Sequence, residues 1–262
     1  DPGTIDKPDV TQKLFVTRTP SMFAITIARE QLKEAFTNES MMGAFISAIF
    51  GQVRNAMEVS LESLGRLAIA NMIAESGARE IRLVTDYIAD TGQTVTAATA
   101  LYNPDFLRYA VARIKSVSDY FEDMGTLYND GTIETFTPRS DQKLKVLSDF
   151  ERRLETVVQY SAFNEQMVSL SAFQMVNFWQ SQQSAANRDS IKIKRASDGT
   201  ETTVNNIMAV LYDADALGLY RRDEDVLTTP VNAKGMYYNT FYHQMELWFN
   251  DTSENFVYFT LN

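Results

Sequence analysis

The run "SMMGAFISAIFGQVRNAMEVSLESLGRLAIANMIAE" (residues 40–75) predicts one very long helix. Its apolar side chains recur in steps of three and four, which is the spacing of one helix face. They are Phe45, Ile49, Val53, Met57, Leu61, Leu64, Ala68 and Met72. A helix of about 35 residues would be roughly 50 Å long. Gly43, Gly51 and Gly65 would each destabilise it by about 1 kcal/mol, so either packing holds the helix together or it breaks near one of them.

The residues before this helix predict a two-stranded hairpin. Residues 13–18 (KLFVTR) and 22–27 (MFAITI) alternate between apolar and polar side chains, and the run TPS at 19–21 has the composition of a turn. Residues 29–36 (REQLKEAF) predict a short helix between the hairpin and the long helix. Because a lone hairpin is only marginally stable in water, we expect this one to lie against another surface.

The rest of the chain alternates between strand and helix patterns. Strands are predicted at 80–87, within 141–148, at 191–196 and 201–204 around a turn at Asp198-Gly199, and at 207–213, 236–249 and 256–261. Helices are predicted from Asn103-Pro104 to about residue 124, from Ser148 to about residue 159, and over the short run 214–217. Residues 128–132, 181–190 and 250–255 predict turns or loops. Together these patterns predict an α+β fold in which distant parts of the chain contribute strands.

Composition excludes several classes of protein. The chain has no cysteine, which excludes disulfides and thiolate sites, and its one histidine excludes a metal site with several histidines from one chain. A net charge of −10 argues against a protein whose main task is to bind nucleic-acid phosphates. No apolar run is long enough to span a membrane. The N-terminus begins with Asp and lacks the pattern of an intact signal peptide, so we expect a trimmed or processed chain.

One stretch has the spacing of a calcium-binding loop. In "DADALGLYRRDE" (residues 213–224) Asp213, Asp215, Gly218 and Glu224 occupy positions 1, 3, 6 and 12 of an EF-hand loop. Leu217 stands where an oxygen ligand belongs, and Arg221 and Arg222 would place positive charge beside the cation. We therefore interpret the stretch as a strand followed by a turn, and we predict no metal ligand and no cofactor.

Catalysis has equally little support in the sequence. His243 alternates with apolar residues of the last part of the chain, which is typical of a buried or interfacial histidine. There is no G-x-S-x-G motif and no glycine-rich phosphate loop. An acidic-residue hydrolase stays an alternative that requires a pocket with converging carboxylates, and a carbohydrate-binding module would require exposed coplanar rings.

The aromatic run at 236–249 predicts a strand with two different faces. We expect its odd-numbered side chains to pack inward, namely Tyr237, Phe241, His243, Met245, Leu247 and Phe249. Tyr238, Tyr242 and Trp248 share the other face and are candidates for contact with another subunit.

Three stretches resemble tailed-bacteriophage major capsid proteins, in the order that family has them. "FAITIAREQLKEAFTNESMMGAFISAIFGQV" (residues 23–53) is similar to the passage from the extended loop into the spine helix. "TPRSDQKLKVLSDFERRLETVVQYSAFN" (residues 137–164) is similar to the central domain of the family, and the part from 207 onwards, with "NAKGMYYNTFYH" (residues 232–243), to its C-terminal strands.

The resemblance implies the Hong Kong 97-type capsid fold, with a long spine helix, an extended β-hairpin loop and mixed axial and peripheral domains. Residues 1–28 would form most of the hairpin loop, and residues 29–96 the spine helix with a peripheral strand. Residues 97–225 would form the axial domain, and residues 226–262 the strands that return to the peripheral and axial sheets. The family normally has an N-terminal arm before the loop, and here that arm is expected to be missing.

The resemblance also implies a function. The chain would be a major capsid subunit of the virion, not an enzyme, and would assemble in the host bacterial cytoplasm into hexamers and pentamers of an icosahedral shell. The shell would enclose double-stranded DNA without sequence-specific binding, with a scaffolding protein as a further partner and no membrane. An encapsulin-like nanocompartment shell protein is the alternative with the same fold.

Ten residues are candidates for the subunit interface. The apolar side chains of the expected hairpin would be an aggregation hazard on a monomer, so we expect a neighbouring subunit to cover them. Arg152 and Arg153 would donate to acids of a neighbour. With the three aromatic residues named above, the full set is Leu14, Phe15, Val16, Phe23, Ile25, Arg152, Arg153, Tyr238, Tyr242 and Trp248.

Overall fold

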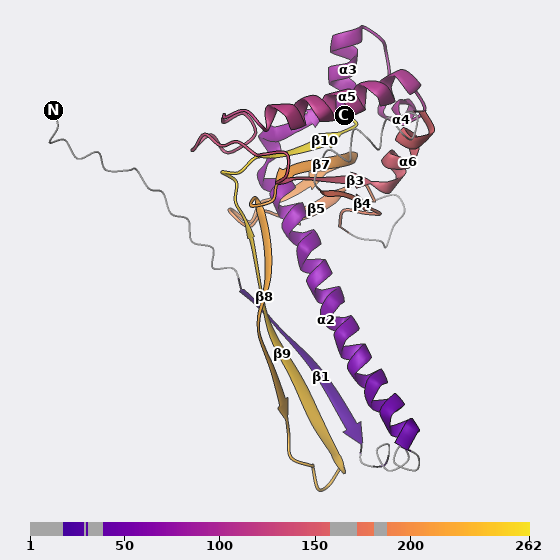
Figure 1. Cartoon of the computed structure of the whole chain (residues 1–262), viewed down its shortest axis with the longest axis vertical. Coiled ribbons are helices and arrows are strands. Elements are labelled where there is room, and N and C mark those ends of the chain that lie inside the picture. The colour runs from indigo at the N-terminus through magenta and orange to yellow at the C-terminus, as the bar shows by residue number, and fades with distance from the viewer. Residues whose placement is uncertain (1–17, 29, 31–38, 158–171, 181–187) are drawn as a thin grey trace, which may run out of the picture.

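The structure is a computed structural model that describes residues 18–28, 30, 39–157, 172–180 and 188–262. Figure 1 shows a body of helices and strands from which one long helix and a narrow sheet extend side by side. The body contains a five-stranded sheet, and the extension contains a three-stranded one. The predicted mixture of helices and sheets is therefore confirmed.

The long helix, α2 (Glu39–Glu75), is continuous, so none of its glycines interrupts it. Its C-terminal part lies in the body, where Ala70, Met72 and Ile73 are buried. Its N-terminal part leaves the body and lies beside the three-stranded sheet (Figure 1). Val53 on the predicted apolar face is buried there, and Phe50, one turn earlier, is more than half exposed but still contacts the sheet through Tyr242. The periodicity therefore identified both the helix and the face that packs.

The three-stranded sheet has the order β1-β9-β8, with β1 (Arg18–Ala28), β9 (Tyr237–Asn250) and β8 (Leu217–Thr228) all antiparallel to their neighbours. The predicted turn at residues 19–21 is wrong, because Thr19, Pro20 and Ser21 continue β1 and pair with β9. Proline is tolerated since β1 is the edge strand among the described residues, where a missing N–H breaks no ladder. Residues 13–17 and nearly all of the short helix predicted at 29–36 lie outside the described residues.

Strand β8 was not predicted. The short helix expected at 214–217 is wrong, since residues 214–216 form a turn and β8 begins directly after it. The charged run RRDED obscures the strand pattern, and the pairing with β9 shifts register between Arg222 and Asp225. Gly218 meets the ring of Phe249 so closely that a Cβ would lie 1.8 Å from its Cε1 atom, so only glycine fits without movement.

The five-stranded sheet has the order β2-β10-β7-β3-β4. Its strands are β2 (Glu80–Arg82), β10 (Phe256–Thr260), β7 (Ile207–Asp213), β3 (Gln142–Leu147) and β4 (Ala172–Val176). The central strand β7 is buried along its whole length, as predicted. The two closing strands, β9 and β10, lie where the sequence predicts them but belong to different sheets.

The strand predicted at 80–87 is wrong beyond Arg82, where the helix α3 (Leu83–Thr91) begins. Leu83, Val84 and Tyr87 are its buried residues, and this spacing places them on one side of a helix turn. The ring of Tyr87 meets that of Phe106 at 5.5 Å, edge to face. Tertiary packing here overrides the β-branched and aromatic composition of the stretch.

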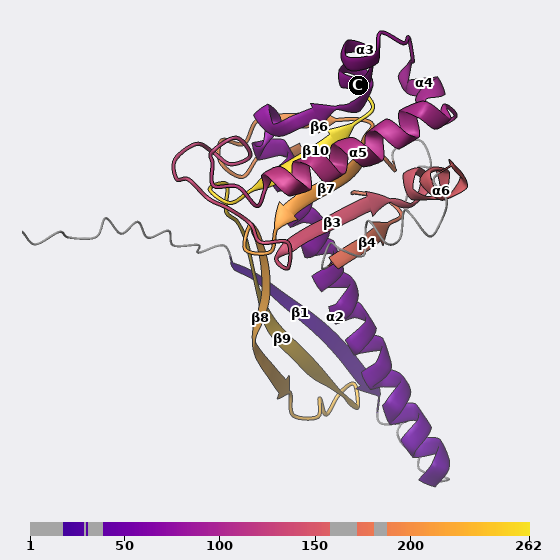
Figure 2. The same ribbon diagram turned by 45° about the horizontal axis from the view of Figure 1, so that its top comes forward.

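Helix α5 (Pro104–Tyr120) lies along the five-stranded sheet, with α4 (Ala97–Ala100) and α6 (Ser148–Val157) near its N-terminal end (Figure 2). The helix opens at Asn103-Pro104 as predicted, and the side chain of Asn103 caps it by accepting from the backbone N–H groups of Asp105 and Phe106. The helix ends at Tyr120, earlier than expected. The short 3-10 helix η1 (Gly77–Arg79) follows α2, and the predicted hairpin at Asp198-Gly199 is confirmed as β5 (Ile191–Lys194) and β6 (Glu201–Val204).

Candidate subunit-contact surfaces

The three-stranded sheet turns one face towards α2, and that face carries the even-numbered residues of β9. Thr240, Gln244 and Glu246 are the buried residues of the strand. The ring of Tyr242 meets Phe50 of α2 edge to face, with 6.3 Å between centroids. The expectation that the odd-numbered face packs inward is therefore wrong. It assumed that the more apolar face is buried, whereas the buried side chains of this strand are polar, and Glu246 accepts hydrogen bonds from three donors.

A polar cluster ties this face to the helix. The carboxyl group of Glu246 accepts from Ser60 Oγ of α2 at 3.2 Å, from Ser21 Oγ of β1 at 3.3 Å and from Gln244 Nε2 at 2.7 Å. Arg221 of β8 donates to the backbone carbonyl of Met57 at 3.4 Å. Each strand of the sheet thus contributes a side chain to the cluster, which fixes the sheet against α2.

The predicted contact residues of β1 belong to this inner face. Phe23 pairs with Tyr242 and Ile25 with Thr240, so both side chains project towards α2 and are half-buried. Tyr238 and Trp248 of β9 are also half-buried. Leu14, Phe15 and Val16 lie outside the described residues. The predicted contact residues of β1 and β9 therefore lie on one face of the sheet. That face is the one that α2 of the same subunit partly covers.

The opposite face of the sheet is the more exposed and apolar one. We define the outer sheet face as Met22, Tyr220, Leu227, Phe241, His243 and Met245. Met22 is 57% exposed, Tyr220 63% and Leu227 54%. His243 lies between Met22 of β1 and Asp225 of β8 in the strand register, 6.4 Å from the Phe241 ring. The alternation of β9 grouped Phe241, His243 and Met245 on one face, but only the position of α2 reveals that this face points outward.

Arg152 and Arg153 are exposed on α6 at the N-terminal end of α5. The guanidinium of Arg153 lies 4.4 Å over the ring centroid of Tyr102 and donates to its hydroxyl at 3.3 Å. Tyr102 itself is 69% exposed. This combination of a stacked arginine and an exposed aromatic ring is typical of protein interfaces.

A cavity of about 510 Å³ lies where α2, β8 and the β3–β4 edge of the larger sheet meet. Arg66 on its wall donates to the carbonyl of Phe178 at 2.6 Å and lies 4.0 Å over the Phe178 ring. Burial lowers the pKa of Lys145, nearby Arg66 lowers it further, and Lys145 Nζ donates to Gln174 Oε1 at 2.8 Å. The lining acids Glu58 and Glu62 each have an arginine partner, so they do not form the converging pair that the hydrolase alternative requires.

In the calcium-like stretch, a turn at residues 214–216 joins the end of β7 to the start of β8. Asp213, at the end of β7, is buried, and its Oδ1 accepts from the backbone N–H of Asp215 at 2.8 Å. The predicted strand and turn are thereby confirmed. Among the described side chains, no group of three or more acids and histidines is placed to hold a metal. No helix in the described part of the chain has the length and apolar character needed to cross a membrane.

Comparison with known proteins decides the family. The family model of the Phi29-like phage major capsid protein matches residues 4–260. The chain belongs to this family. It is therefore a structural protein, a major subunit of a phage capsid, and this assignment favours the phage subunit over a nanocompartment shell protein. No curated protein sequence matches the capsid subunit.

Solved structures agree on the fold. A chain in the capsid structure of Staphylococcus phage Andhra matches with a TM-score of 0.60 and 12% identity, over 95% of this chain and 72% of that one. A chain in the structure of the head fibre and inner core protein of native bacteriophage P68 matches with a TM-score of 0.61 and 10% identity. The match covers 95% of this chain and 72% of that one. At these identities the likeness concerns the fold alone, and it places the capsid subunit among mixed helix-and-sheet capsid folds.

Proposed function

We propose that this capsid subunit assembles into hexamers and pentamers of an icosahedral shell of the Hong Kong 97 type. The observation that supports this most is the long α2 with the three-stranded sheet beside it, in a chain of a capsid family. Such an extension exposes the outer sheet face, and an apolar face of this kind is a liability on a monomer. In a shell a neighbouring copy covers it.

The domain ranges are part of the proposal. Residues 1–28 would belong to the extended loop, 29–96 to the spine region, 97–225 to the axial domain and 226–262 to the returning strands. The boundary at 225/226 falls within β8, which runs between the body and the extension. We infer that β8 and β9 connect the two domains mechanically, since both strands are continuous across that distance.

The contact residues follow from the same proposal. Leu14, Phe15, Val16, Phe23 and Ile25 would be covered by a neighbour together with Tyr238, Tyr242 and Trp248, and Arg152 and Arg153 would donate to a neighbour's acids. To these we add the outer sheet face, because its side chains are more exposed than those turned towards α2.

The cargo and place of assembly are inferred from charge and family. A subunit with a net charge of −10 would enclose double-stranded DNA by confinement and not by tight phosphate contacts. We propose that assembly occurs in the bacterial cytoplasm with a scaffolding protein, and that the finished subunit resides in the virion without a membrane.

The test is assembly of the full-length gene product, expressed alone and together with the scaffolding protein of the same phage. Sedimentation and electron microscopy are expected to reveal closed shells, with rings of five and six subunits on their surface. A protein that remains monomeric in both expressions and is absent from purified virions would contradict the proposal.

A further inference from the structure

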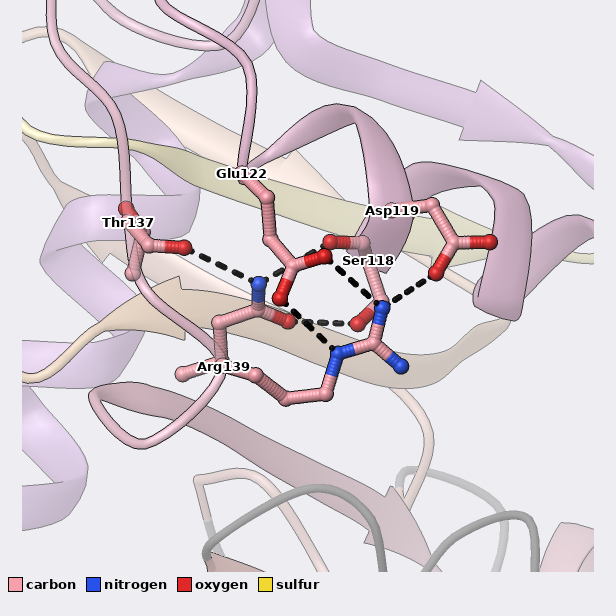
Figure 3. A network of polar contacts seen from close by, with 6 residues as sticks. Ser118, Asp119, Glu122, Thr137 and Arg139 are labelled. Atoms are coloured by element: carbon pink, nitrogen blue, oxygen red, sulfur yellow. Dashed lines mark hydrogen bonds and ion pairs between the residues drawn. The ribbon is translucent and has the colours of Figure 1, made fainter.

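The loop that joins α5 to β3 (residues 121–141, the α5–β3 loop) is held by polar contacts on both sides. Gln142, buried at the start of β3, donates through Nε2 to the carbonyls of Ser118 at 2.9 Å and Thr137 at 3.1 Å. Arg139 forms ion pairs with Asp119 and Glu122. Figure 3 shows these side chains converging between the helix end and the returning loop. The two ends of the loop are therefore fixed to each other.

The tip of the loop is equally well held. The amide of Asn129 donates to the carbonyl of Ile133 at 2.8 Å and accepts from the backbone N–H of Gly131 at 2.8 Å. Gly131 has φ +79, a left-handed conformation that glycine adopts without strain. The backbone N–H of Phe256 in β10 donates to the carbonyl of Tyr128 at 2.9 Å, which fastens the tip to the larger sheet.

This rigid loop and the last residue of α5 expose large apolar side chains. They are Tyr120, Met124, Leu127, Ile133 and Phe136, of which Leu127 is 73% and Met124 64% exposed. A hollow of about 200 Å³ lies beside three of them, and it is lined by Tyr120, Asp123, Met124, Gly125, Leu127, Tyr128 and Asn255. Because the loop is already ordered, a partner that fills the hollow does not have to overcome the entropy of ordering it.

The charges around the hollow are mainly negative. Asp119, Glu122, Asp123 and Glu134 are exposed beside the apolar side chains, and Arg139 is engaged with two of them. The surface therefore fits an aromatic side chain accompanied by positive charge. Such a group exists on this chain, where Tyr102 stands exposed with Arg153 stacked on its ring and Arg152 next to it.

The two surfaces lie at opposite ends of α5, as Figures 1 and 2 both show. A helix of 17 residues separates their attachment points by about 25 Å at 1.5 Å per residue. One subunit therefore cannot bring its own Tyr102 into its own hollow. Contacts of this kind, in which different surfaces of identical chains meet, generate closed rings when the rotation between neighbours closes.

We propose that the α5–β3 loop of one capsid subunit receives Tyr102 of the next copy in its hollow, with Arg152 and Arg153 facing Asp123 and its acidic neighbours. The inference rests on the proposed function and specifies which two surfaces join neighbouring subunits within a ring. Residues 121–141 supply the receptor side, and the N-terminal end of α5 with α6 supplies the inserted side.

The first test is a charge exchange. Asp123→Arg alone and Arg153→Asp alone are each expected to reduce the sedimenting particle fraction about tenfold or more, because reversing one member of an interface charge pair weakens association strongly. The double variant, which has the net charge of the original chain, is expected to assemble again. Thermal unfolding of each variant verifies that the monomer is folded.

The second test uses the absence of cysteine from the chain. Asp123→Cys and Arg153→Cys together place two thiols that a short bis-maleimide can join only between copies, since α5 keeps them apart within one subunit. Assembled particles are expected to give a ladder of covalent oligomers on denaturing gels, and each single-cysteine variant serves as the control.

The outcomes separate this inference from the proposed function. The ring contact would be overturned if both single charge-reversal variants assemble normally and the double-cysteine particles give no ladder. The proposed assembly into a shell would then still stand. Charge reversals that abolish only the binding of scaffolding protein would overturn it as well. A subunit that gives no particles in its original form would contradict the proposed function instead.

Discussion

Ser60 of α2 donates a hydrogen bond of 3.2 Å to the buried carboxyl group of Glu246 on β9. Ser21 of β1 donates to the same oxygen at 3.3 Å. Segments that are far apart in the sequence thus meet at one fully buried side chain, beside the helix that extends from the body. Because hydrogen bonds are directional, the cluster fixes the position of α2 along the sheet more specifically than apolar contacts alone would.

Replacing Glu246 is therefore expected to destabilise the extension. In Glu246→Ala the buried amide of Gln244 loses its acceptor, which costs about 1–3 kcal/mol, whereas the part-buried hydroxyls of Ser21 and Ser60 can turn to water. We expect the free energy of unfolding to fall by about 2–3 kcal/mol in urea denaturation. Glu62→Ala removes an exposed carboxylate paired with Arg66 on the same helix and is expected to cost less than about 1 kcal/mol. Equal losses in the two variants would contradict the role of the cluster.

Gly218→Ala is expected to be among the most damaging small substitutions in the chain. The added methyl group would lie 1.8 Å from Cε1 of Phe249, so either the ring or the β8 backbone has to move. Overpacking of this kind destabilises by about 1–3 kcal/mol. Gly51→Ala in α2 is the matched control, because nothing lies within 4 Å of its added Cβ. That substitution is expected to stabilise the helix by up to about 1 kcal/mol.

Combining Gly218→Ala with Phe249→Leu is expected to recover part of the loss, since the smaller side chain leaves room for the methyl group. Thermal unfolding of the single and double variants measures this coupling. A double variant whose loss is the sum of the two single losses would show that the ring is not the cause.

The acid stability of the larger sheet depends on Glu80 of β2. Burial of Glu80 raises its pKa, but hydrogen bonds from Thr260, Asn262 and Arg82 outweigh burial and hold the pKa below its ordinary value. The pKa of Glu80 is lower in the folded state than in the unfolded state. The ionised carboxylate therefore stabilises the fold fully above the unfolded-state pKa of about 4.3, and this contribution is lost as the pH falls through the folded-state pKa. In Glu80→Gln the thermal unfolding midpoint is expected to decrease less with falling pH, below about pH 4.3, than in the original chain. An unchanged acid profile would contradict this assignment.

The sequence predicted those elements whose pattern is long or strongly bounded. α2 carries its apolar period over most of its length, β7 is an uninterrupted apolar run, and the β5–β6 hairpin has Asp198-Gly199 at its turn. In each of these elements the local preference and the tertiary environment agree, so that reading the residues alone was sufficient.

The predictions that the structure contradicts share one physical cause, which is that tertiary contacts override local sequence preference. The run at 19–21 has turn composition, but pairing with β9 keeps it extended. Residues 83–87 have strand composition, but packing against α5 makes them helical. For β9 the alternation separated two faces correctly and could not indicate which one meets α2. The decisive residues, Gln244 and Glu246, are polar, and their burial depends on partners that are far away in the sequence.

The two faces of the three-stranded sheet are expected to respond differently to substitution. Tyr242→Ala removes a half-buried ring that contacts Phe50, and we expect the monomer to lose about 1–2 kcal/mol of stability. Leu227→Ser on the outer sheet face changes an exposed side chain, so the stability of the monomer should change by less than about 0.5 kcal/mol.

For assembly we expect the opposite ranking, with Leu227→Ser the more damaging of the two substitutions. If a neighbouring copy covers the outer sheet face, Leu227→Ser buries a hydroxyl where an apolar contact belongs and is expected to lower the particle yield in sedimentation. Tyr242→Ala should reduce that yield only as far as it unfolds the monomer. Particle yield and urea stability, measured on the same preparations, distinguish the two effects, because a contact residue lowers the first without the second. A yield from Leu227→Ser equal to that of the original chain would contradict the assignment of the outer sheet face to a subunit interface.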